Sequence, residues 1–143
     1  MLSLGWARNQ PILVIERNNV TQKMRVLIAD DQRRARQSMK ALLGAWYPDA
    51  ELREAANGVE AIILVGEFHP DLVLMDVRMP KMDGLEGLRQ IKTMRRQTRV
   101  IILSMYPEHE AEALAAGADA FVSKSDPPEK LRETLAGITG ELN

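Results

Sequence analysis

The feature that most constrains this fold is a regular alternation of strand-like and helix-like segments that begins at residue 24. The strand-like segments span residues 24–29, 50–56, 72–75, 99–103 and 120–123. Each is followed by a stretch whose apolar residues recur at helical spacing, as at residues 35, 39, 42, 43 and 46. The second segment is the most polar, which is typical of an edge strand. Five strand-then-helix units predict an α/β fold with a parallel sheet and helices on both faces.

Turn and capping residues mark the ends of the last two helices. Gly117 stands where a C-terminal glycine would close the fourth helix, which is predicted over residues 107–116. Ahead of the fifth helix, Asp126 can act as the N-cap, and Glu129 follows it at the spacing of a capping box. Pro127 suits the first helical position. We therefore expect the fifth helix to begin at Pro127.

Residues 1–23 do not follow the alternation. Residues 12–15 are apolar enough to form a strand, but Asn18, Asn19 and the polar run up to Lys23 interrupt the pattern. The 143-residue chain has the length of one domain. We expect residues 24–143 to form that domain and residues 1–23 to be an appendage of unknown order.

Composition excludes several classes of protein. Nineteen Lys and Arg against 20 Asp and Glu give a net charge of −1, so the chain has no overall basic field for nucleic acid. It has no cysteine, which excludes disulfides, thiolate metal sites and cysteine nucleophiles. No apolar run reaches the roughly 18 residues of a membrane span, and the N-terminus lacks the features of a secretory signal. We expect a cytoplasmic protein that binds neither nucleic acid nor membrane directly.

Polar side chains follow four of the predicted strands at the points where those strands end: Asp30 and Asp31, Asp76, Ser104, and Lys124. In open parallel sheets, ligands bind at the carboxyl ends of the strands. Carboxylates gathered there would repel one another by about 4 kcal/mol per pair at 4 Å and an effective dielectric constant near 20. Mg²⁺, which prefers oxygen ligands, and a lysine would offset that repulsion. The pattern predicts phosphoryl transfer to a carboxylate oxygen.

The sequence resembles the receiver domain of two-component response regulators, most closely receivers of the NarL/LuxR type. The motifs that carry the resemblance lie at residues 24–31, 71–84, 100–104 and 117–124. The similarity extends over about residues 24–142. It implies a flavodoxin/CheY-like, doubly wound sheet with strand order 2-1-3-4-5. It also implies a role in phosphorelay signal transduction, with no turnover beyond the protein's own aspartyl phosphorylation and dephosphorylation.

The resemblance assigns a metal site and a phosphoacceptor. It implies that Asp76 accepts a phosphoryl group from the phosphohistidine of a sensor histidine kinase. It implies that Asp30, Asp31, Asp76 and the backbone carbonyl of Arg78 hold Mg²⁺, with Asp31 the more direct ligand and Asp30 acting mainly through water. Mg²⁺ is then the cofactor.

The resemblance also assigns a switch. Ser104 corresponds to the hydroxyl that hydrogen-bonds the phosphoryl group, Lys124 to the cation that pairs with it, and Phe121 to the aromatic switch residue. The fourth helix, fifth strand and fifth helix would then form the output face, for an output domain or a second copy of the chain. Many relatives carry Tyr at the position of Phe121, so a switch here would work by packing alone.

The other departure from the family pattern is Ser125, which stands where many receivers have a proline joined to the lysine by a cis bond. A cis bond to a non-proline residue costs about 2.5–4 kcal/mol. The sequence therefore does not decide whether the Lys124–Ser125 peptide bond is cis or trans.

Two alternative functions compete with this interpretation, a phosphatase and a DNA-binding transcriptional regulator. Phosphatases of the haloacid-dehalogenase type carry a second Asp two residues after the nucleophile, where this chain has Arg78. This residue argues against turnover on an external substrate. The other alternative is the receiver half of a DNA-binding transcriptional regulator, with a helix-turn-helix domain that this chain lacks.

Other polar residues are expected to be structural. His69 and His109 have no partner at ligand spacing, so both are predicted to be exposed to solvent. The basic clusters at residues 33–36 and 95–99 are predicted to be solvated faces or ends of helices.

Overall fold

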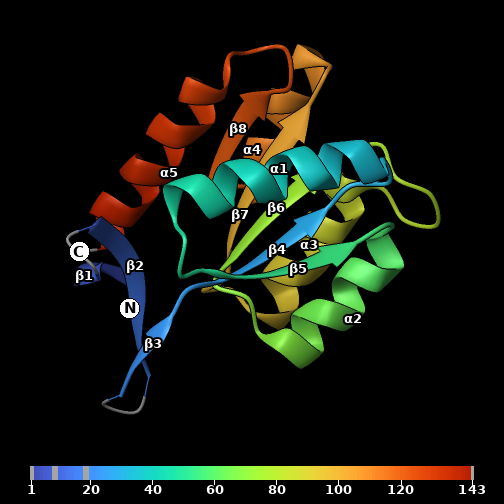
Figure 1. Cartoon of the computed structure of the whole chain (residues 1–143). Coiled ribbons are helices and arrows are strands. Elements are labelled where there is room, and N and C mark those ends of the chain that lie inside the picture. The colour runs from blue at the N-terminus through green and yellow to red at the C-terminus, as the bar shows by residue number, and fades with distance from the viewer. Residues whose placement is uncertain (1, 8–9, 18–19, 143) are drawn as a thin grey trace.

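The computed structural model of the chain describes residues 2–7, 10–17 and 20–142. Its centre is a five-stranded parallel sheet in the order β5-β4-β6-β7-β8 (Figure 1). The strands are β4 (Arg25–Ala29), β5 (Glu51–Ala55), β6 (Leu72–Asp76), β7 (Arg99–Ser104) and β8 (Ala120–Ser123). In chain order this is 2-1-3-4-5, which confirms the predicted doubly wound topology.

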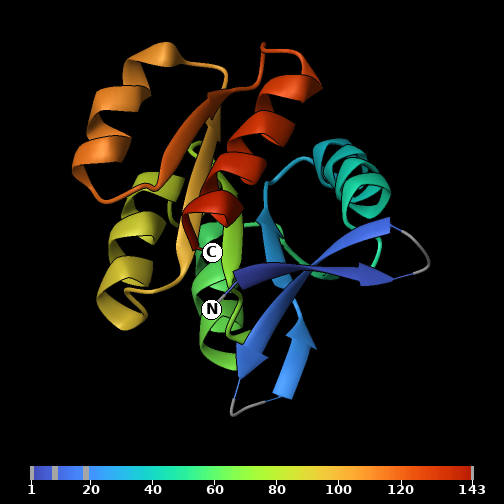
Figure 2. The same cartoon turned by 90° about the vertical axis from the view of Figure 1, so that its left-hand side faces the viewer.

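Helices cover both faces of this sheet, as predicted (Figures 1 and 2). The helices are α1 (Arg33–Trp46), α2 (Gly58–Phe68), α3 (Gly84–Met94), α4 (Glu110–Ala115) and α5 (Pro128–Leu142). Helices α1 and α5 pack on one face through Leu43, Leu131 and Leu135. Helices α2, α3 and α4 contribute to a second apolar cluster on the other face. No helix in the described part of the chain has both the length and the apolar character needed to cross a membrane.

Strand position in the sheet follows from the apolar pattern. Every residue of β6 is buried, because this strand is central and covered on both faces. Strand β5 alternates exposed and half-buried residues, which confirms its predicted place at an edge. All the neighbouring pairs are parallel, so the carboxyl ends of β4, β6, β7 and β8 lie at one edge of the sheet.

The boundaries of the last two helices differ slightly from the prediction. Gly117 has a φ of 104° and ends the fourth helix as expected, but this helix starts as a 3₁₀ turn, η1 (Pro107–His109). Helix α5 begins at Pro128, one residue later than predicted. The reason is that the Asp126 N–H bonds to the Ser123 carbonyl at 3.1 Å, so Asp126 belongs to the turn after β8.

The N-terminal residues form a sheet of their own, which the sequence did not predict. Strands β1 (Leu2–Ala7), β2 (Gln10–Arg17) and β3 (Val20–Lys23) pair antiparallel in the order β1-β2-β3. The expected strand at residues 12–15 lies within β2. Strand β1 contacts α5, so this small sheet rests against the end of the last helix (Figure 1). The division into an appendage and one domain remains a prediction.

Asp119 joins α3 to the amino ends of β7 and β8, at the edge of the sheet opposite the candidate site. Its carboxylate accepts hydrogen bonds from Lys92 Nζ of α3 at 2.8 Å, Arg99 at 3.1 Å and the backbone N–H of Val100 at 2.8 Å. Burial by itself raises the pKa of Asp119, but the bonds from Lys92 and Val100 outweigh it, and the pKa lies below its ordinary value of 3.8. The charged form of Asp119 therefore stabilises the fold.

We expect Asp119→Ala to lower the free energy of unfolding at pH 7 by about 1.5–3 kcal/mol, the range for hydrogen bonds to a charged group. Because the pKa is depressed in the folded state, this stabilisation is complete above the pKa of the unfolded chain. It is lost as the pH falls through the lower pKa of the folded state. Urea unfolding at pH 7 and pH 3 measures the difference. Asp126→Ala removes an exposed carboxylate and is the control. A gap between wild type and Asp119→Ala that does not narrow at pH 3 would contradict this role.

Candidate functional site

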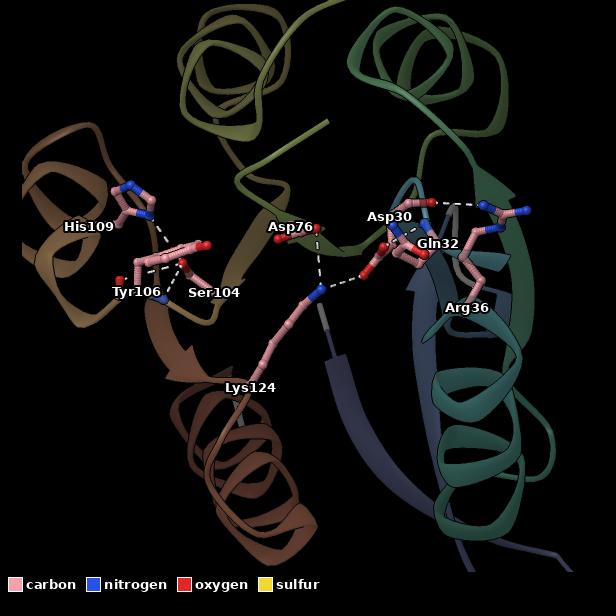
Figure 3. A network of polar contacts seen from close by, with 8 residues as sticks. All are labelled: Asp30, Gln32, Arg36, Asp76, Ser104, Tyr106, His109 and Lys124. Carbon is pink, nitrogen blue, oxygen red and sulfur yellow. Dashed lines mark hydrogen bonds and ion pairs between the residues drawn. The ribbon is translucent and has the colours of Figure 1, made fainter. Parts of the chain in front are cut away.

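The carboxyl ends of the strands bring the predicted residues into one region (Figure 3). Asp30 directly follows β4, Asp76 is the last residue of β6, Ser104 ends β7 and Lys124 directly follows β8. Parallel register holds these ends together, because Asp76 lies opposite Leu103 and Ser104 lies opposite Ser123. Four strand ends that are far apart in the sequence thus share one site.

Three carboxylates form a candidate metal centre. Oxygen atoms of Asp30, Asp31 and Asp76 all lie within 4.8 Å of one another. Asp30 and Asp76 are 5% and 9% exposed, whereas Asp31 is exposed to solvent. A set of hard oxygen ligands with one side open to water suits Mg²⁺, which retains several of its waters. The residues present therefore fit a divalent cation.

Lys124 balances the charge of this cluster. Its Nζ lies 2.7 Å from Asp30 and 3.2 Å from Asp76 (Figure 3). Burial by itself lowers the pKa of Lys124, but the hydrogen bond to Asp30 and the charge of Asp76 outweigh it, so that the pKa is raised. The ammonium group remains protonated and links the two carboxylates.

Asp76 has the properties of a reactive carboxylate. Burial raises its pKa above the ordinary value; the charge of Lys124 opposes this shift and that of Asp30 adds to it. One of its oxygens, Oδ2, faces Lys124 Nζ (Figure 3). Asp76 is therefore held in a partly dry position next to a fixed positive charge, which suits it to receive an electrophilic group.

The loop after β6 closes tightly behind Asp76. Asp83 caps α3 by accepting a hydrogen bond from the Glu86 N–H at 2.9 Å, and the Gly84 N–H bonds to the Val77 carbonyl at 2.7 Å. A Cβ at position 84 would overlap the Asp76 carbonyl, so only glycine fits this approach. The Arg78 side chain is exposed and lies 4.0 Å from the centre of the Tyr106 ring. The role of the Arg78 carbonyl as a metal ligand remains a prediction.

Ser104 lies on β7, the strand next to that of Asp76, and Phe121 lies on β8, one strand further along the sheet. Ser104 is 1% exposed, and its carbonyl accepts a hydrogen bond from the Lys124 N–H at 2.8 Å, which joins the ends of β7 and β8. Phe121 is half-buried against the apolar cluster and pairs in register with Ile102. The switch roles of Ser104 and Phe121 remain predictions.

The structure shows the conformation of the Lys124–Ser125 peptide bond, which the sequence did not decide. There is no cis peptide among the residues described. The Ser123 and Ser125 hydroxyls lie 2.7 Å apart, and the Ser125 N–H bonds to the Ser123 hydroxyl at 3.2 Å. A serine-rich turn stands where many receiver domains have a proline joined by a cis bond.

The prediction for one histidine was wrong. His69 is exposed as expected, but His109 is half-buried, and its Nδ1 lies 3.0 Å from the Ser104 hydroxyl. The 3₁₀ turn that begins at Pro107 carries residue 109 back toward the end of β7. That proline, three residues after Ser104, is the signal in the sequence that could have indicated this return.

The prediction that residues 33–36 form a solvated face was also wrong in part. Arg33 and Arg34 are exposed, but the Arg36 side chain is 15% exposed and bonds to Glu54 at 3.0 Å. The Nη1 atom of Arg36 donates to the Asp30 backbone carbonyl at 2.8 Å. Arg36 thereby fixes the end of β4 that carries the acidic pair. The Glu54 carboxylate on the neighbouring edge strand was the available signal.

With this geometry in view, comparison with known proteins identifies the class. The sequence matches the response regulator receiver domain over residues 26–136. The chain belongs to this family, and matches of the NarL and LuxR types are among its relatives.

Individual relatives agree with this assignment. The uncharacterized transcriptional regulatory protein YhcZ of Bacillus subtilis is 37% identical over 120 residues, which cover 82% of this chain and 56% of YhcZ. The chain thus spans about half the length of this relative. A LuxR-family two-component response regulator from Aurantimonas sp. SI85-9A1 has 30% identity and a TM-score of 0.76, over 82% of this chain and 85% of that one. The CheX-CheY-BeF3-Mg+2 complex from Borrelia burgdorferi has 26% identity and a TM-score of 0.75, over 81% and 89%.

The metal site generates a prediction about stability. Mg²⁺ that binds only the folded chain should raise the melting temperature as its concentration rises, by the linkage RT ln(1 + [L]/Kd). We expect Asp31→Ala to lose most of this rise, because the substitution removes the solvent-facing carboxylate of the cluster. Thermal unfolding over a series of Mg²⁺ concentrations measures this rise in melting temperature.

The control for this experiment is Asp126→Ala, which removes an exposed carboxylate two residues after Lys124 and should keep the full rise. A Mg²⁺-dependent rise in Asp31→Ala equal to that of the wild type would exclude Asp31 as a ligand.

Proposed function

We propose that this chain receives a phosphoryl group on Asp76 from the phosphohistidine of a sensor histidine kinase, in a reaction that depends on Mg²⁺. The observation that carries the proposal is the position of Asp76 at the end of the central strand. There it lies 3.2 Å from Lys124 Nζ and within 4.8 Å of the two other acidic side chains. Membership of the receiver family supports a role in phosphorelay signalling.

The transfer follows from these positions. An Asp76 carboxylate oxygen attacks phosphorus while the phosphorus–nitrogen bond of the phosphohistidine breaks, and the electron pair of that bond stays on the imidazole. The acidic cluster would hold Mg²⁺, which supplies positive charge opposite the developing negative charge on the phosphoryl oxygens. Lys124 pairs with one phosphoryl oxygen, since its ammonium already contacts Asp76.

The switch follows from the charge that transfer brings. An aspartyl phosphate adds roughly −1.5 to −2 charges, by analogy with other phosphorylated side chains. The Ser104 hydroxyl and Lys124 are drawn toward it and move the loops after β7 and β8. Movement of Ser104 makes room into which Phe121 can rotate. Signalling then proceeds from the α4-β8-α5 face, where Leu114 of α4 already exposes apolar surface to a second copy or an output domain.

A second candidate is the receiver half of a DNA-binding transcriptional regulator. YhcZ is described as a transcriptional regulatory protein, and this chain spans 56% of its length. The same Asp76 chemistry would then control an output domain outside this chain. In that case too, the net charge of −1 argues against direct DNA contact by the chain itself.

The first prediction here is that Asp76 is the only phosphate acceptor. With Mg²⁺ and acetyl phosphate, the wild type should gain one phosphoryl group and Asp76→Asn none, because the amide is not a nucleophile. Intact mass measured over time gives the result. Asp126→Asn is the control and should react like the wild type. Reaction of Asp76→Asn at the wild-type rate would refute the assignment.

The second prediction separates phosphorylation from the switch. We expect Lys124→Ala to remain phosphorylatable but to show no change on the α4-β8-α5 face, because the cation that would pull the loop after β8 is missing. Hydrogen exchange of residues 105–125, with and without beryllofluoride, measures the change. Equal exchange protection in the wild type under both conditions would rule out this switch.

A further inference from the structure

The Ser104 hydroxyl is fully engaged before any phosphoryl group arrives. It accepts a hydrogen bond from the Tyr106 N–H at 3.0 Å, lies 3.0 Å from His109 Nδ1, and lies 3.4 Å from the Tyr106 carbonyl. A serine hydroxyl has one proton and two lone pairs. If His109 Nδ1 is unprotonated, it accepts that proton. If Nδ1 carries a proton, it donates to the hydroxyl oxygen, whose two lone pairs are then both occupied. The hydroxyl proton is in that case left to bond to the Tyr106 carbonyl.

In either tautomer, the hydrogen bonds of the hydroxyl stay within residues 104–109. Figure 3 shows the consequence: Ser104, Tyr106 and His109 form one group, while Lys124, Asp76 and Asp30 form another. Within the described residues, no hydrogen bond joins the Ser104 hydroxyl to either Asp76 or Lys124. A phosphoryl group on Asp76 can only accept, so it must capture the one hydroxyl proton.

The local backbone holds His109 in this place. Pro107 begins the 3₁₀ turn, and the His109 N–H bonds to the Tyr106 carbonyl at 3.1 Å. The imidazole meets the Tyr106 ring edge to face, with centroids 5.6 Å apart and planes at 64°. The Arg78 guanidinium lies over that same Tyr106 ring. The imidazole is therefore supported by the turn and by a ring that is itself packed.

We propose that His109, in the tautomer with Nδ1 unprotonated, is a positioning residue that accepts the Ser104 hydroxyl proton in the unphosphorylated protein and so competes with the phosphoryl group for that proton. The proposal rests on the proposed function of Asp76. His109 touches neither the phosphoryl group nor the metal ligands in this account and acts only through Ser104. It sets how strongly the site favours the state before phosphorylation over the state after it.

The test uses beryllofluoride with Mg²⁺ as the probe of the phosphorylated state, titrated by calorimetry. His109→Phe keeps a ring against Tyr106 but removes the acceptor. It should bind beryllofluoride about 3- to 10-fold more tightly, the effect of one neutral hydrogen bond. His109→Asn places an oxygen near the position of Nδ1 and should restore the wild-type affinity.

Two further measurements distinguish positioning from general loosening of the loop. In a Ser104→Ala background, His109→Phe should leave the affinity unchanged, because the residue on which it acts is gone. In the wild type, the Nδ1 nitrogen resonance of His109 should shift when beryllofluoride is added. The chain has two histidines, so exposed His69 is the internal control and should not shift.

An unchanged or weaker affinity in His109→Phe, the same fold-change with and without Ser104, or an unmoved His109 resonance would each overturn the proposal. Failure of the proposed phosphoacceptor function of Asp76 would give a different result. In that case the wild type would not bind beryllofluoride, or Asp76→Asn would bind it equally well, and both proposals would fall.

Discussion

The ion pairs of Lys124 with Asp30 and Asp76 are the interaction on which the rest of the site depends. A folded sheet that gathers three carboxylates at one edge must offset their repulsion, and a lysine 2.7 Å and 3.2 Å from two of them contributes the opposite charge. Lys124 reaches them from the end of β8, the far edge strand. The Lys124 side chain thus links the end of β8 to the ends of β4 and β6.

This arrangement connects stability to function. Because burial raises the pKa of Asp76 and Lys124 opposes that shift, the charge state of the carboxylate depends on where the ammonium lies. The proposed phosphoryl group on Asp76 would change the partners available to Lys124, whose backbone N–H is bonded to the carbonyl of Ser104. A change of charge at Asp76 would therefore reach both β7 and β8, and the segment that follows β7 bears the exposed apolar side chains Met105 and Leu114.

The sequence predicted the central sheet and the acidic site because both depend on short patterns. Apolar runs specify strands, parallel pairing places their carboxyl ends at one edge, and Asp30, Asp76, Ser104 and Lys124 occupy those ends. The N-terminal sheet was not predicted because its strands pair antiparallel with one another and lie outside the strand-then-helix alternation from which the central sheet was predicted. The contacts of Arg36 and His109 depend on the packing of α1 against β5 and on a 3₁₀ turn, which residue spacing alone does not specify.

The most direct test of the account is to locate the phosphoryl group chemically. The phosphorylated wild type would be treated with borohydride, which reduces an aspartyl phosphate to homoserine, and the peptides would be sequenced by tandem mass spectrometry. If Asp76 is the phosphoacceptor, homoserine is found at position 76, with Asp30 and Asp31 unchanged. Conversion of Asp30, Asp31 or another carboxylate in place of Asp76 would contradict it.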